Sequence, residues 1–257
     1  MAVSDRLRIR LFPPAQHPYC ILEAEIGRLL RPDYTLLDAG CGRAGELLRL
    51  FGSRVREVIG VDVGDFGSLV TGPNCRYIRA DLSRIDLPDA SVDIVVSRSV
   101  MEHLKDPLPA YRELGRILKP GGYFVFLTPN LWDYASLISR LIPNRLHASI
   151  VRRTEGRDEA DTFPTWYRSN TAPTIARLAG ASGFRVVSCK YLVPYPKYLR
   201  FNALLFLATA AYAKTIGTTH RLRHLRPWIL AMLQKNEFPR PARLTVEVCA
   251  VGPSKTC

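Results

Sequence analysis

Short apolar runs alternate with helical patterns along the first half of the chain. Near-continuous apolar runs at 91–97 and 123–127 are typical of parallel strands that are buried on both faces. Shorter runs at 35–38, 58–62 and 77–82 predict three more strands, each with an acidic residue at or near its end. Apolar residues recur every three or four positions over 19–30 and 107–118, which predicts helices. The alternation indicates an α/β protein.

The alternation breaks after residue 130. Residues 131–172 are too long for a simple connection in a compact domain, and we expect this insertion to carry function. Thr171, just before a Pro173 helix start, suits an N-cap. A sixth strand is predicted at 184–191 and a seventh at 244–251, with a basic and apolar helical insertion at 192–243 between them. Residues 1–257 are therefore expected to form one domain, with its cofactor core at 19–130 and its sheet closed by 173–191 and 244–251.

A glycine-rich turn follows the first predicted strand. Gly40, Gly42 and Gly45 follow the acid Asp38 and precede a helical pattern, an arrangement that brings backbone N–H groups against a nucleotide-like ligand. This spacing also satisfies the dinucleotide fingerprint. However, the carboxylate of Asp38 would repel a pyrophosphate in a shielded site. S-adenosylmethionine (SAM) carries no phosphate but has an ammonium and a sulfonium group, so Asp38 favours SAM.

Two further acids end the next strands. Asp62 lies 24 residues after Asp38, about one βαβ step, where an acid can accept hydrogen bonds from both ribose hydroxyls. Asp81 could accept a hydrogen bond from an adenine amino group, with Leu82 packing on the ring.

These motifs, together with 80–81 and the Leu118–Gly122 segment, resemble those of the class I SAM-dependent methyltransferases, most closely the ubiquinone-type O-methyltransferase branch. The resemblance covers roughly 19–130, with weaker matches at 174–190 and 244–251. It implies a Rossmann-like, mainly parallel seven-stranded sheet of order 3-2-1-4-5-7-6, with the seventh strand antiparallel. It implies SAM as cofactor and no metal. The residues expected to bind SAM are Asp38, Gly40, Cys41, Gly42, Asp62, Val63, Asp81, Leu82 and Ser97.

Methyl transfer from SAM needs alignment of acceptor, methyl group and sulfur, and a hydroxyl acceptor also needs a base. His103 follows the carboxyl end of the fourth strand, where ligands bind in open α/β sheets, and is the first candidate for base or orienter. It could equally only start a helix. His147, in the first insertion, is the second candidate. The candidates for an aromatic and cationic acceptor wall, which could equally be core packing, are Arg98, Tyr134, Trp166, Tyr167 and Arg168.

The chain is strongly basic, with 36 Lys and Arg against 23 Asp and Glu, a net charge of +13. Such charge favours nucleic acid, anionic substrates or an anionic membrane surface. No Asn/Asp-Pro-Pro-Tyr motif and no Pro-Cys nucleophile follows the fourth strand, which argues against methylation of nucleic-acid bases. We therefore expect O-methylation of a small-molecule, lipid or glycan acceptor. A non-catalytic SAM-fold binding protein and an NAD-dependent oxidoreductase stay open as alternatives.

The segment 201–213 carries no charge, yet it is shorter than the roughly 20 residues of a membrane span. With its basic flanks, 201–235 could contact a membrane surface or form a helical cap on the core. Six scattered cysteines without a CxxC pair predict reduced thiols and no zinc site, and no signal-peptide pattern opens the chain. A cytoplasmic location, with membrane association open, is expected. The oligomeric state is not predicted.

Overall fold

The computed structural model describes residues 12–64, 72–133, 163–194 and 203–237. Within these residues, seven strands form one sheet of order β3-β2-β1-β4-β5-β7-β6. The strands are β1 Thr35–Ala39, β2 Glu57–Asp62, β3 Cys75–Arg79, β4 Val92–Arg98, β5 Leu118–Pro129, β6 Phe184–Leu192 and β7 Trp228–Lys235. The pairs among β1 to β5 are parallel, whereas β7 runs antiparallel to both β5 and β6. The fold class and strand order predicted from the resemblance are confirmed.

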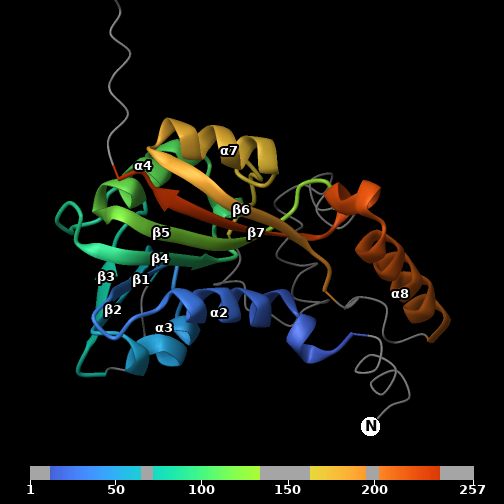
Figure 1. The fold of residues 1–257 in the computed structure, drawn as a ribbon, viewed down its shortest axis with the longest axis horizontal. Helices are drawn as coiled ribbons and strands as arrows, with labels where there is room; N and C mark the ends of the chain where they lie inside the picture. Colours follow the sequence, from blue (N-terminus) through green and yellow to red (C-terminus); the bar gives the residue numbers. More distant parts are fainter. Residues whose placement is uncertain (1–11, 65–71, 134–162, 195–202, 238–257) are drawn as a thin grey trace, which may run out of the picture.

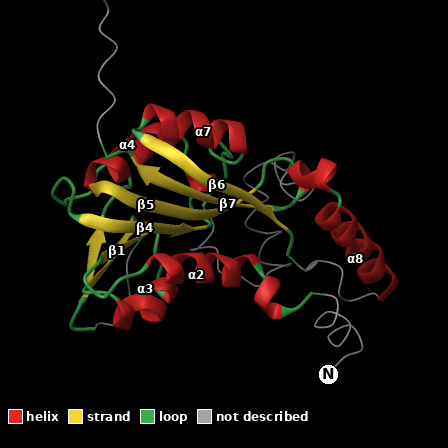
Figure 2. Cartoon of the chain, viewed as in Figure 1, coloured by secondary structure: helices red, strands yellow, loops and turns green. Residues whose placement is uncertain are grey.

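Helices cover both faces of the sheet, as Figures 1 and 2 show. The helices α2 (Pro18–Leu29) and α3 (Glu46–Phe51) lie on one face, and α4 (Pro107–Ile117) and α7 (Ala172–Ala181) lie on the other. The Thr171 hydroxyl accepts a hydrogen bond from the Thr174 N–H, so the predicted N-cap of α7 is confirmed. A further helix, α8 (Ala203–Thr218), lies beyond the end of the sheet and is followed by the 3₁₀ turns η5 (His220–Leu225).

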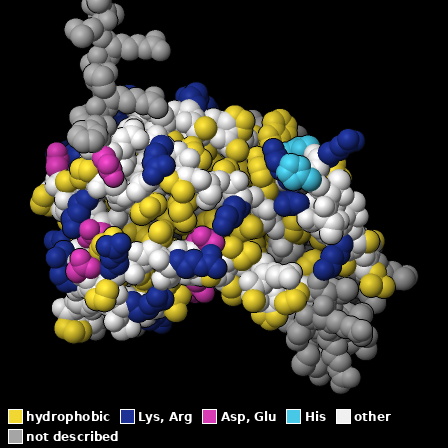
Figure 3. Space-filling model, in the orientation of Figure 1, with side chains coloured by type: hydrophobic (Ala, Val, Ile, Leu, Met, Phe, Trp, Pro, Cys, Tyr) yellow, Lys and Arg dark blue, Asp and Glu magenta, His cyan; other side chains and the backbone are white. Residues whose placement is uncertain are grey.

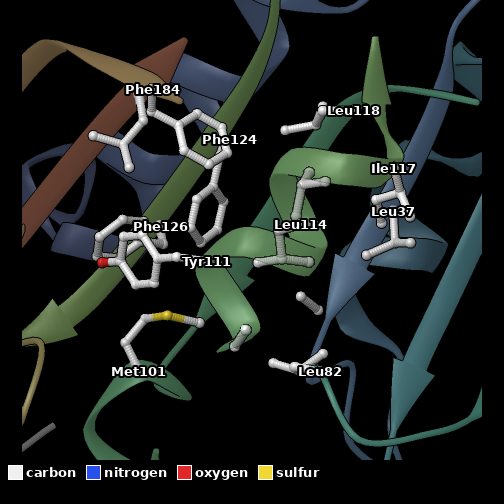
Figure 4. Packing of buried hydrophobic residues seen from close by; sticks show 14 of the residues in the cluster. Leu37, Leu82, Met101, Tyr111, Leu114, Ile117, Leu118, Phe124, Phe126 and Phe184 are labelled. Atoms are coloured by element: carbon white, nitrogen blue, oxygen red, sulfur yellow. The ribbon is translucent and has the colours of Figure 1, made fainter. Parts of the chain in front are cut away.

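Alternate residues of the central strands supply two separate cores. On the α4 and α7 side, Phe124 and Phe126 of β5 pack with Tyr111 of α4 (Figure 4), whose ring lies edge-on to both at 5.7 and 6.1 Å between centroids. On the α2 and α3 side, the neighbouring residues Val125 and Leu127 pack instead. Each such side chain stabilises the fold by about 1.5–3 kcal/mol when fully buried. The near-continuous apolar runs therefore reflect burial on both faces.

The seventh strand lies at a different place in the chain from the one predicted. The sequence predicted it at 244–251, but β7 is Trp228–Lys235, inside the stretch assigned to the helical insertion 192–243. The physical reason is the apolar run at 228–233, which is buried between β5 and β6. Residues 244–251 lie outside the described residues. The helical part of the insertion between β6 and β7 is confirmed and ends at Leu225.

Two element boundaries also differ from the prediction. β5 begins at Leu118, directly after α4, so the Lys119–Gly122 segment belongs to the strand and does not separate it from the helix. β3 ends at Arg79, two residues before Asp81. Most of the predicted insertion 131–172 lies outside the described residues. No helix in the described part of the chain is long and apolar enough to traverse a bilayer.

Candidate active site

The glycine-rich turn after β1 is held against the end of β2. Gly40 and Gly42 have φ of +81° and +61°, in the region that favours glycine. The N–H groups of Gly40 and Cys41 donate to the Val61 carbonyl oxygen at 2.8 and 3.2 Å. The turn therefore crosses the carboxyl ends of two parallel strands, where open α/β sheets bind ligands.

The two glycines have different surroundings. A Cβ added at Gly40 would lie 2.2 Å from Cγ2 of Val100, so the loop after β4 packs directly on this residue. A Cβ added at Gly42 would meet no heavy atom within 4 Å. Gly40 therefore lets the β1 and β4 ends approach each other, while Gly42 keeps open the space above the turn.

Asp62, at the end of β2, joins the turn to the loop that follows it. Its Oδ2 accepts a hydrogen bond from the Gly42 N–H at 2.9 Å, and its Oδ1 accepts one from the Gly64 N–H at 2.8 Å. The residue is half-buried. Each carboxylate oxygen has a second lone pair, so Asp62 can bind both backbone groups and still accept from a diol.

Asp38 is buried, with a relative exposure of 2%. Burial raises its pKa to about 7; the Arg98 guanidinium opposes this shift, and the carboxylates of Asp62 and Glu46 add to it. Arg98 pairs with Glu46 and lies over the Tyr19 ring, 4.6 Å from its centroid. Arg98, predicted to bind the acceptor, is thus placed with the acids of the glycine turn.

The remaining predicted cofactor residues differ in what their side chains can reach. Cys41 is buried in the α3-side core, and burial raises the pKa of its thiol, so its backbone is the part that belongs to the turn. Val63 is exposed at 48%, beside Asp62. Leu82 is buried in the α4-side core. Asp81 is exposed, and its Oδ1 accepts from the Ser83 N–H at 2.8 Å, which fixes the carboxylate at the end of β3.

The end of β4 carries two serines with different environments. The Ser97 hydroxyl is fully buried and donates to the Ala39 carbonyl oxygen at 2.7 Å, so this side chain joins β4 to β1. Ser99 has φ of +58°, unusual for a residue with a side chain. Its buried hydroxyl oxygen has no hydrogen-bond partner among the described residues.

His103 ends the 3₁₀ turn η3 (Met101–His103) that follows β4. Its Nδ1 lies 3.0 Å from the Pro164 carbonyl oxygen, so Nδ1 donates and Nε2 carries the lone pair. Nε2 lies 3.9 Å from Oε1 of Glu102, whose other oxygen accepts from the Thr128 hydroxyl at 3.1 Å. A proton taken up at Nε2 would therefore lie beside a buried carboxyl group.

Part of the predicted acceptor wall lies next to the η3 turn that carries His103. The N–H groups of Trp166 and Tyr167 donate to the Glu102 carbonyl oxygen at 2.7 and 3.1 Å, which joins this segment to η3. Trp166 is 38% exposed, and the Lys105 ammonium lies 5.5 Å from its ring centroid. Arg168 follows on the same segment and is exposed. Tyr134 and His147 lie outside the described residues.

A buried polar network that the sequence analysis did not predict supports this side of the site. The Asn170 amide donates to the Thr128 hydroxyl at 2.7 Å and to the Pro129 carbonyl oxygen at 2.8 Å. The Tyr111 and Ser169 hydroxyls are hydrogen-bonded at 2.7 Å. These contacts fix Ser169 and Asn170 against α4 and the end of β5. Local signals for them are absent because the partners lie about 40 to 60 residues apart in the chain.

The residues of the turn fit SAM. Asp62 and Glu46 lie close enough to Asp38 to raise its pKa. Because these three side chains are acidic, the region favours a cation and disfavours a pyrophosphate. Gly42 leaves open space, and Asp62 keeps lone pairs for a sugar. The exposed Val63 offers an apolar contact beside that acid.

Comparison with known proteins identifies the same domain. The family described as "Methyltransferase domain" matches residues 37–126. A probable S-adenosylmethionine-dependent methyltransferase of Mycolicibacterium smegmatis is 42% identical over 158 residues, which cover 57% of this chain and 60% of that protein. A malonyl-[acyl-carrier protein] O-methyltransferase of Serratia marcescens is 34% identical over 117 residues, which cover 42% of this chain and 45% of that protein. The match thus spans less than two thirds of either relative.

The fold comparison agrees. The crystal structure of a SAM-dependent methyltransferase from Mesorhizobium loti matches with a TM-score of 0.56 at 18% identity, over 84% of this chain and 97% of that one. The matched motifs lie on β1 to β5, around the glycine turn and the acids Asp38 and Asp62. The resemblance seen in the sequence is confirmed at the level of the family, and SAM is the cofactor that this family implies. Residues 37–126 are therefore a methyltransferase domain, and the chain has the fold of the class I SAM-dependent methyltransferases.

Proposed function

We propose that the protein transfers a methyl group from SAM to a hydroxyl oxygen of a small-molecule, lipid or glycan acceptor. The observation that carries the proposal is the set of carboxylates around an open glycine turn, which suits a cationic nucleoside without phosphate. When bound, SAM supplies a methyl carbon on a positively charged sulfur, which is a good leaving group.

On the cofactor side, this chain's residues bind and orient. The backbone of the turn at Gly40 to Gly42 would line the methionine part of SAM, with Asp38 near its positive charge. Asp62 would accept from the ribose hydroxyls while it holds the turn through the Gly42 N–H. Asp81 would accept from the adenine amino group, since its Oδ1 contact with Ser83 N–H leaves Oδ2 for a ligand.

On the acceptor side, His103 is the proposed base. Its Nδ1 is oriented by the Pro164 carbonyl oxygen, so Nε2 would receive the hydroxyl proton, and the buried Glu102 would stabilise the imidazolium. Trp166, Tyr167 and Arg168 would bind the acceptor and exclude water. Arg98 is proposed to act mainly through Glu46 and Asp38, since its guanidinium is paired there.

An oxygen acceptor is supported by the similarity to a protein named as an O-methyltransferase that acts on malonyl-[acyl-carrier protein]. The positive charge of the whole chain favours an anionic acceptor. The site has no base-reading element among the sequence motifs, so nucleic acid is not proposed.

The test is incubation of the protein with a cell extract and SAM that carries an isotope-labelled methyl group, followed by mass spectrometry of the products. A labelled methyl ether that survives alkali supports the proposal, whereas an alkali-labile product would indicate a carboxylate acceptor instead of a hydroxyl. His103→Gln should lower the yield of labelled product and leave SAM binding intact. SAM binding without any labelled product would favour the non-catalytic alternative, and hydride exchange with NAD would favour the oxidoreductase.

A further inference from the structure

The positive charge of this protein is confined to one part of the chain. Residues 1–161 contain 22 Lys and Arg and 21 Asp and Glu, so they are almost neutral. Residues 162–236 contain eleven Lys and Arg and no Asp or Glu. Such asymmetry between parts of one chain points to a surface that meets an anionic partner. Figure 3 agrees: acidic side chains are seen at the left and centre of the view, and none is seen over α8 and η5.

The helix α8 is unusual because its solvent face lacks the charges that solvent faces normally carry. Ala210, Ala213 and Ile216 form its buried face. Large exposed apolar side chains lie on either side of this buried face, with Leu207 at 45% and Tyr212 at 38%, and the exposed residues between them include Ala208, Ala211 and Thr215. Lys214 is the one charged residue on the helix within 203–218. The exposed side of the helix therefore carries apolar residues, threonines and a single lysine.

Basic residues continue the same surface beyond the helix. Arg221 and Arg223 of η5 are exposed, and Arg223 contacts His220 at 2.7 Å. We call the residues Leu207, Tyr212, Lys214, Arg221 and Arg223 the α8 surface.

The α8 surface is anchored beside the acceptor side of the site. The Asn130 amide, at the end of β5, donates to the carbonyl oxygens of His224 and Arg226 at 2.6 and 2.8 Å. The Arg226 guanidinium donates to the last carbonyl oxygens of α8, those of Ile216 and Gly217, at 2.9 and 2.7 Å. Arg226 thereby fixes the helix end that carries the negative dipole. Trp132 lies two residues after Asn130 and is 53% exposed. The hydrogen bonds of Asn130 therefore also place an exposed aromatic residue near η5.

We propose that the α8 surface docks on an anionic lipid bilayer. A bilayer surface accepts both features at once, because apolar side chains enter the boundary between headgroups and acyl chains while arginines and lysines pair with anionic headgroups. Nucleic acid would use the charge but gives no role to the exposed Leu207. The helix is too short to cross the bilayer, so the contact lies in the interface.

Docking in this way places the carboxyl end of β5 near the membrane. The inference does not rest on methyl transfer, because it uses the charge and exposure of α8 and η5 only. It predicts that the protein binds vesicles with or without SAM.

The test is co-sedimentation of the full chain with vesicles of phosphatidylcholine alone and of phosphatidylcholine mixed with phosphatidylglycerol. We expect binding to the mixed vesicles that weakens as salt is raised from about 0.1 M to about 1 M. Arg221→Gln together with Arg223→Gln should weaken binding at least tenfold, since each arginine near an anionic surface contributes about fivefold. Leu207→Glu should also weaken it.

Matched controls are available elsewhere on the chain. Leu50 in α3 is 47% exposed, so Leu50→Glu adds the same charge at a similar exposure. Arg112 in α4 is exposed, so Arg112→Gln removes the same kind of charge. Both controls should bind vesicles as the unchanged protein does, and all variants should keep SAM affinity, which shows that they fold. Equal binding to neutral and anionic vesicles, equal loss in the controls, or binding of DNA but of no vesicle would each overturn the proposal.

Discussion

Replacing Asp38 with asparagine should stabilise the free protein at neutral pH and weaken its binding of SAM. Asp38 is 2% exposed, and its pKa is raised from 3.8 to about 7 because burial penalises the carboxylate. A carboxyl group whose pKa is raised by folding lowers the stability as pH increases from the unfolded to the folded pKa. The loss begins near pH 4 and is complete above about pH 7.

The size of the stability difference follows from the shift in the pKa of Asp38. About three pKa units at 1.36 kcal/mol each give about 4 kcal/mol as the full cost of the ionised carboxylate. The asparagine amide must itself be buried, which costs about 1–3 kcal/mol if it lacks partners. The net expectation is that Asp38→Asn is about 1–3 kcal/mol more stable than the unchanged protein at pH 8, and about 1–3 kcal/mol less stable near pH 4, where the Asp38 carboxyl is uncharged.

Urea unfolding at several pH values between 4 and 8.5, without SAM, measures the stability difference. Calorimetric titration with SAM at the same pH values measures the second effect. Below pH 7 the unchanged protein must release the Asp38 proton to bind a cation, so its affinity should rise by up to tenfold per pH unit. The variant should bind more weakly, without this rise. Asp81→Asn, an exposed acid of the same site, is the control and should leave the pH dependence of stability unchanged. A variant that is less stable at every pH, or that keeps the pH dependence of SAM affinity, would show that Asp38 is not the buried carboxylate that ionises to bind SAM.

Four other substitutions separate the roles of the glycine turn and of the buried polar network. Gly40→Ala should lower the stability measured by urea unfolding by about 2–4 kcal/mol, because its Cβ would lie 2.2 Å from Val100 at a positive φ. Gly42→Ala has open space around it and should lower the stability by about 1 kcal/mol, but it should lower SAM affinity at least tenfold. Equal stability losses in the two variants would contradict the different surroundings of the two glycines. Asp62→Ala should weaken SAM binding by ~1–3 kcal/mol in calorimetry if ribose hydroxyls lose their acceptor, and unchanged affinity would exclude the ribose role. Asn170→Ala should lower stability by about 2 kcal/mol through two lost hydrogen bonds, whereas a neutral result would show that the network is dispensable.

The sequence predicted those parts of the fold that depend on local patterns. The runs that became β4 and β5 were recognisable because burial on both faces leaves few polar positions. The glycines of the turn were recognisable because positive φ at Gly40 and Gly42 restricts the residue type. Asp62 was placed correctly at the end of its strand because the βαβ unit fixes the spacing.

The seventh strand was misplaced because nothing local distinguishes its apolar run at 228–233 from a helical segment. Its structure is decided by pairing with β5, more than a hundred residues earlier, and with β6. Because the run at 228–233 follows the basic residues of η5, its sequence pattern resembles a continuation of the helical insertion.

In the site, the backbone positions were predictable and the side-chain partners were not. Arg98 was predicted to meet the acceptor, yet it pairs with Glu46, 52 residues away. The same limitation hid the bond between Asn170 and Thr128 and the contact of His103 with the Pro164 carbonyl oxygen. Side-chain direction at a strand end depends on what packs against it, and these neighbours come from distant segments.

We expect the glycine turn and its acids to select a cationic nucleoside without phosphate. Calorimetric titration of the unchanged protein with SAM and with NAD, under identical conditions, measures this selectivity. We predict saturable binding of SAM and no measurable heat from NAD at the same concentrations. Saturable binding of NAD without binding of SAM would contradict the assignment.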